Sequence, residues 1–72
     1  MTESTGHRLW RLRKLHQFVD AELREHDAGV EVLFFYNGQL SYGRQLPTLA
    51  AALSEAADKR AHLEREGWMF HW

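Results

Sequence analysis

The chain has 72 residues, a formal net charge of −1 at pH 7 and no cysteine. Its length suits one small domain, and without cysteine it has neither disulfides nor thiolate zinc sites, so apolar packing must hold the fold together. The near-neutral charge argues against a strong general affinity for nucleic acid, which needs many cations facing phosphate.

The first residues contain no apolar stretch of the kind found in signal peptides, and no run approaches the roughly 20 apolar residues of a membrane helix. We therefore expect a cytoplasmic protein with no membrane partner. Residues 1–6 are polar and are predicted to form a flexible arm on a single domain that spans 1–72.

The stretch from about Gly6 to Asp27 has the spacing of an amphipathic helix. Apolar residues recur three and four positions apart, which places them on one helical face: Leu12, Leu15, Val19 and Leu23. Trp10 and Phe18 fall on the far side, where a solitary amphipathic helix does not need them.

A β-hairpin is predicted where "VEVLFFY" is followed by "NG" and "QLSYGRQL", because Asn-Gly suits the positive φ angles of a type I′ turn. A two-residue loop sets Tyr36 opposite Gln39 and Glu31 opposite Arg44. In this register we expect one face to meet the helices: Leu33, Phe35, Leu40 and Tyr42. The other face sets large apolar groups beside small or polar ones: Val30, Val32, Phe34 and Tyr36.

A second helix is predicted over about Leu49 to Glu66. Pro47 cannot continue the strand, Thr48 is a good N-cap, and Gly67 suits the position just past the helix end. The residues expected to be buried are Leu49, Ala52, Leu53, Ala56 and Leu63.

The chain closes with "GWMFHW", and three interpretations of this aromatic tail stay open. It forms a short third strand on an edge of the hairpin, or packs between the helices without pairing, or is exposed and binds a partner. The expected fold is therefore α+β in the order α-β-β-α, with an antiparallel hairpin, and an optional short C-terminal strand, packed against two helices.

No residue pattern predicts catalysis or a cofactor. The five histidines lack a metal-ligand spacing, the serines lie in no nucleophile elbow, and there is no glycine-rich phosphate loop. We therefore predict a protein that is not an enzyme and has no catalytic, cofactor-binding or metal site.

A core of this size can absorb only part of the three tryptophans, two tyrosines and four phenylalanines. A contiguous exposed apolar patch marks a protein interface, and twofold self-association is its commonest form. We therefore expect an interaction module that forms a homodimer or binds another protein. The candidate interface residues are Trp10, Phe18, Val32, Phe34, Tyr36, Trp68, Phe70 and Trp72.

The alternative is a weak nucleic-acid-binding domain that uses the basic first helix. A basic helix with an aromatic side chain can follow phosphates and stack on a base, although later acidic residues oppose this. The candidate contacts are Arg8, Trp10, Arg11, Arg13, Lys14 and Arg44.

Three segments carry a resemblance to a known group of proteins: "RLWRLRKLHQFVDAELRE", "VEVLFFYNGQLSYGRQLPT" and "AALSEAADKRAHLEREGWMFHW". In its turns, apolar positions and closing Gly-Trp, the chain resembles small bacterial proteins of unknown function. The resemblance covers most of the chain and contains no catalytic signature. It implies a bacterial, cytoplasmic, stand-alone domain and no particular activity.

Overall fold

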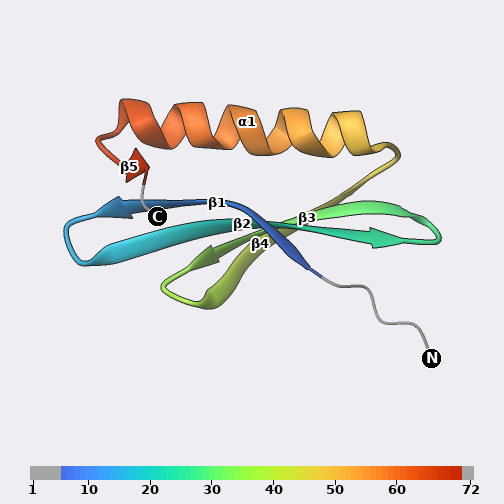
Figure 1. Cartoon of the computed structure of the whole chain (residues 1–72), viewed down its shortest axis with the longest axis horizontal. Helices are drawn as coiled ribbons and strands as arrows, with labels where there is room; N and C mark the ends of the chain where they lie inside the picture. Colours follow the sequence, from blue (N-terminus) through green and yellow to red (C-terminus); the bar gives the residue numbers. More distant parts are fainter. Residues whose placement is uncertain (1–5, 71–72) are drawn as a thin grey trace.

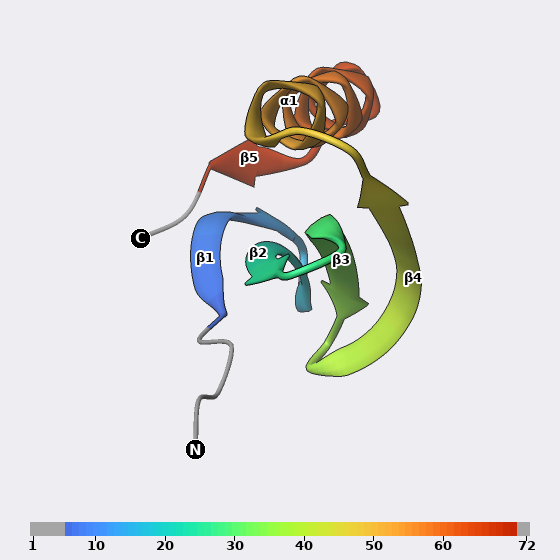
Figure 2. The same ribbon diagram turned by 90° about the vertical axis from the view of Figure 1, so that its right-hand side faces the viewer.

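The computed structural model describes residues 6–70, which form a five-stranded antiparallel sheet and one helix (Figure 1). The elements are β1 (His7–Lys14), β2 (Gln17–His26), β3 (Gly29–Tyr36), β4 (Gln39–Leu46), α1 (Leu49–Arg65) and β5 (Met69–Phe70). The strand order is β4-β3-β2-β1-β5, and α1 lies over one face of the curved sheet (Figure 2). The predicted arm at residues 1–6 lies almost wholly outside the described residues.

The predicted first helix is wrong, because residues 7–26 form the hairpin of β1 and β2. Apolar and polar residues in this segment also alternate with the period of a strand: Trp10 and Leu12 are buried, while Arg11 and Arg13 point away from the core. Leu15, which the helical pattern placed on the buried face, lies in the turn and is 80% exposed. The α-β-β-α architecture is therefore replaced by four strands, one helix and a short strand.

The predicted hairpin of β3 and β4 is present, with Asn37 and Gly38 both at positive φ in its loop. Tyr36 is opposite Gln39 and Phe35 is opposite Leu40, as predicted. A bulge at Ser41 then shifts the register by one, so Glu31 faces Gln45 instead of Arg44.

The predicted assignment of the hairpin faces is also wrong. Val32 and Phe34 are fully buried against the helix, and Tyr42 stacks on Phe34 with the ring centroids 6.0 Å apart. Phe35 and Leu40 lie on the opposite face. Because β2 pairs with β3 and β1 pairs with β2, Val32 and Phe34 lie near the centre of the sheet.

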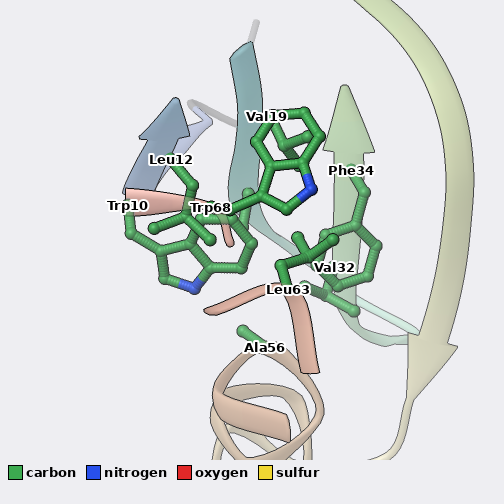
Figure 3. Packing of buried hydrophobic residues seen from close by; sticks show 9 residues of the cluster. Trp10, Leu12, Val19, Val32, Phe34, Ala56, Leu63 and Trp68 are labelled. Atoms are coloured by element: carbon green, nitrogen blue, oxygen red, sulfur yellow. The ribbon is translucent and has the colours of Figure 1, made fainter. Parts of the chain in front are cut away.

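The core lies between α1 and the sheet, where side chains from β1, β2 and β3 meet those of the helix (Figure 3). Its main members are Trp10, Leu12, Val19, Ala21, Val32, Phe34, Ala56, Leu63 and Trp68. Ala52 and Ala56 let the helix approach the sheet closely. The predicted burial of Leu49 and Leu53 is wrong, since both are more than two-fifths exposed.

Both ends of α1 are capped as the sequence predicts. Thr48 Oγ1 accepts a hydrogen bond from the Ala51 amide at 3.1 Å. At the other end, the Gly67 amide donates to Glu64 O and the Trp68 amide to Leu63 O, with Gly67 at φ 101°. This pair of bonds is a Schellman motif, and it turns Trp68 back onto Leu63.

Candidate functional site

Most of the residues predicted to form an interface lie inside the domain. Trp10, Val32, Phe34 and Trp68 are buried, and Tyr36 packs edge-on against Trp68 with ring centroids 6.3 Å apart. These side chains build the core of one chain, so they are not available to a partner. The structure does not bring the seven of these residues that it describes together on one surface.

The two other described members of that set lie on different strands, β2 and β5. Phe18 is half-buried on the sheet face away from α1, and Phe70 is 46% exposed on β5. Trp72 lies outside the described residues. Two interpretations of the tail each apply in part: Trp68 packs in the core, and Met69 and Phe70 form a short strand. This strand pairs with β1 and not with the predicted hairpin.

The outer edge of β4 is the longest open edge in the described part of the chain. β4 pairs only with β3, and seven of its eight residues are exposed. Leu40 is 60% and Tyr42 49% exposed, and Arg44 is the only charged residue in the strand. The bulge at Ser41 interrupts this edge near its start, and the segment from Tyr42 to Leu46 beyond it, with so little charge, is a template for pairing with another strand.

The opposite edge of the sheet is protected in three ways. β5 pairs with Leu12 and Arg13 of β1, and a bulge interrupts β1 between Arg8 and Trp10. The exposed positions of β1 are also mostly basic. Bulges, charges and a covering segment are the usual means by which proteins block edge pairing, so the two edges differ in what they can bind.

The sheet face away from α1 carries a partly buried ion pair beside an aromatic ring. Arg11 donates to Asp20 through Nε at 2.6 Å and through Nη2 at 3.1 Å. The hydrogen bond to Asp20 and its negative charge raise the pKa of Arg11 above its ordinary value, so this guanidinium stays charged. Arg11 and Arg13 both lie over the Phe18 ring, 5.3 and 5.8 Å from its centroid.

The six predicted nucleic-acid contacts are also dispersed. Trp10 is buried and cannot stack on a base, and Arg44 is bound to Glu55 of α1 at 3.0 Å. Arg8, Arg11 and Arg13 lie on β1, where Arg8 is opposite Glu22 and Arg11 opposite Asp20. Arg8 and Arg11 therefore each face a carboxylate, and the six residues do not form one uninterrupted basic surface.

A groove of about 650 Å³, which the sequence did not predict, lies where the β1–β2 turn meets the end of α1 and β5. Its lining residues are Arg13, Lys14, Leu15, Gly67, Met69 and Phe70. Lys14 Nζ donates to Glu66 O at 2.8 Å and so links the hairpin to the helix end. No local pattern reveals this groove, because it joins residues more than fifty positions apart.

Among residues 6–70, no three histidine or carboxylate side chains are grouped as metal ligands would be. His62 and Glu66 form an i,i+4 ion pair at 3.2 Å on the exposed side of the helix. Within the same range, no helix has the length and apolar character to cross a membrane.

Comparisons with family models, with curated proteins and with solved structures found no match to this chain. The resemblance to small bacterial proteins therefore stays a prediction.

Proposed function

We propose that this chain is a non-enzymatic protein-interaction module of the cytoplasm that self-associates through β4. The observation that carries the proposal is the open, nearly uncharged edge of β4, at the side of the sheet opposite the protected one. Pairing two such edges satisfies main-chain groups that otherwise need water, and it joins two sheets into one.

The sequence of β4 is compatible with pairing to itself around a twofold axis. An axis at Gly43 sets Tyr42 of one copy opposite Arg44 of the other, twice, and places no side chains at the centre. An arginine beside a tyrosine ring is a favourable pair, and Arg44 keeps its contact with Glu55. The closed twofold arrangement also uses up both open edges, which limits assembly to a dimer.

The size of this interface predicts a reversible dimer. One paired strand with Leu40 and Tyr42 covers less area than the roughly 1,200–2,000 Å² of a stable interface. We therefore expect a dissociation constant in the micromolar range or weaker, with little dependence on salt, because β4 contains one charged residue.

Light scattering over roughly a hundredfold range of concentration around the micromolar level tests this proposal. The wild-type mass should rise from monomer towards dimer. Leu40→Lys and Ser41→Lys, which put charge on the edge without touching the core, should shift the transition at least about tenfold to higher concentration. Met69→Lys on β5 is the matched control and should leave it unchanged.

Two results would overturn self-association through β4. One is a monomer throughout the series; the other is a dimer that both β4 variants leave intact.

Weak nucleic-acid binding is the second candidate, favoured by Arg11 and Arg13 stacked on Phe18 at the open sheet face. Asp20 and Glu22 on the same face limit its strength. A labelled single-stranded oligonucleotide should then bind with an affinity that falls steeply with salt. Arg13→Ala should weaken this binding without changing the dimer.

A further inference from the structure

The groove beside the β1–β2 turn is separate from β4 and carries two cations without a carboxylate partner among the described residues. Arg13 Nε donates to Leu15 O at 3.1 Å, and Lys14 Nζ donates to Glu66 O. Four other arginines each hold a carboxylate: Arg11 with Asp20, Arg24 with Glu22, Arg44 with Glu55 and Arg60 with Glu64. The charges of Arg13 and Lys14 are therefore available to an anionic ligand.

The same groove gathers apolar side chains that are partly or largely exposed. Leu15 is 80%, Met69 70% and Phe70 46% exposed, and the guanidinium of Arg60 lies 4.6 Å from the Phe70 ring centroid. A basic rim around an apolar floor matches a ligand that presents an apolar side chain next to a carboxylate.

Leu15 is unfavourable for the folded chain in two respects. Its φ of 57° is a left-handed conformation that is unfavourable for a residue with a Cβ, and its apolar side chain, which stays exposed, gains little from folding. Asparagine or glycine would suit this turn position better. Strained residues of this kind occur at binding sites, where contact with a ligand compensates for them.

We propose that this groove binds a short acidic peptide segment of another protein, with a leucine or phenylalanine seated among Leu15, Met69 and Phe70. The carboxylates of that segment pair with Arg13 and Lys14. A second copy of the chain does not supply these groups through β4, which contains no acidic residue. An anionic membrane is the less favoured occupant, because the groove lining has two cations, whereas segments that bind anionic lipids carry clusters of about four to eight.

Fluorescence anisotropy with the labelled peptide Glu-Asp-Leu-Phe-Asp-Glu tests this inference. The peptide should bind saturably, with a dissociation constant on the order of tens of micromolar. Peptides with Gln and Asn in place of the acids, or with Ser-Ser in place of Leu-Phe, should bind at least about tenfold more weakly. The double variant of Arg13→Gln and Lys14→Gln should bind the acidic peptide at least about tenfold more weakly than the wild type.

Leu15→Asn keeps the test valid if the double variant folds poorly, because asparagine tolerates the turn conformation. This variant should stay folded and lose peptide affinity, whereas Leu40→Lys on β4 should bind the peptide like wild type. The inference fails if the acidic peptide does not bind, if the neutral peptide binds equally well, or if the chain sediments with phosphatidylserine vesicles and ignores the peptide. None of these results bears on the mass measurements for β4, so the two proposals fail independently.

Discussion

At the scale of single residues, a few backbone positions decide how the strands are connected. Leu15 and Asn37 are the non-glycine residues with positive φ in the described part of the chain, and each lies in a two-residue hairpin loop. Asn37 is well suited to this conformation, and its Oδ1 also accepts from the Phe18 amide at 3.0 Å. Leu15 has neither advantage, so the first hairpin forms in spite of its loop.

Replacing Leu15 by asparagine should therefore stabilise the chain. Relief of the left-handed strain predicts a gain of about 0.5–1 kcal/mol in the free energy of unfolding, which is a rise of a few degrees in Tm. Urea and thermal denaturation measure both quantities. Leu40→Asn, at an exposed leucine without positive φ, is the control. An equal gain in this variant would show that removing an exposed apolar side chain, and not relief of backbone strain, explains the effect.

At the scale of elements, the Schellman turn after α1 is what places the aromatic tail. The turn reverses the chain at Gly67, delivers Trp68 into the core and leaves Met69 and Phe70 beside β1. An added Cβ at Gly67 would meet Lys14 Cε at 3.6 Å, an ordinary contact, so its φ of 101° is the reason for glycine.

Gly67→Ala should destabilise the fold by about 1–2 kcal/mol, because alanine resists the left-handed conformation. Gly67→Asn should cost clearly less, since asparagine enters that region more readily. Chemical denaturation of the two variants gives the comparison. Equal losses would indicate a steric cause and contradict the backbone explanation.

The two aromatic residues on either side of Met69 should differ sharply in their contribution to stability. Trp68→Ala removes a buried side chain from the core and should cost about 3–5 kcal/mol, a large part of the roughly 4–11 kcal/mol expected for a chain of this length. Phe70→Ala, at a half-exposed position, should cost about 1 kcal/mol or less. Denaturation midpoints that are equally low for both variants would mean that Phe70 is also part of the core.

At the scale of the whole molecule, the sheet is asymmetric from edge to edge and from face to face. β2 and β3 have a paired strand on each side, whereas β4 is paired on one side only. α1 covers a single face, and in the described residues no other element covers the opposite one (Figure 1). The self-association and peptide-binding proposals both arise from parts of the sheet that this arrangement leaves open.

Hydrogen exchange should follow this asymmetry. Amides of Val19–Leu23 in β2 and Val32–Phe34 in β3 should exchange slowest, at rates close to those of global unfolding. Amides of Tyr42–Leu46 that point outward should exchange fast in dilute solution and slow down as the protein concentration rises. Exchange in β4 that does not depend on concentration would contradict dimerisation through this edge.

The second half of the chain was predictable because its signals are local. An Asn-Gly loop, a threonine N-cap and a glycine after the helix end each act through their nearest neighbours. The sequence is therefore enough to predict the second hairpin and α1. Residues 7–26 were not predictable in this way. Their apolar residues fit both a helix and two strands, and β-pairing with β3 decided the outcome by supplying a partner for β2.

The candidate surfaces were less predictable than the fold. Trp10, Val32 and Phe34 look like surplus apolar residues only when the sheet has two strands, and the five-stranded sheet under α1 buries them. Conversely, the exposure of Leu40 and Tyr42 depends on which strand is the edge, and the groove depends on β5 pairing with β1.

Local sequence signals account for four features of this protein: the Asn37–Gly38 turn, the cap at Thr48, the end of α1 just before Gly67 and the absence of disulfides. These depend on backbone conformations and hydrogen bonds within a few residues. Only the tertiary structure decided the state of residues 7–26, the register beyond Ser41, the buried face of the hairpin and the position of the tail. Each of these follows from pairing or burial between distant segments, whose free energy no single stretch of sequence contains.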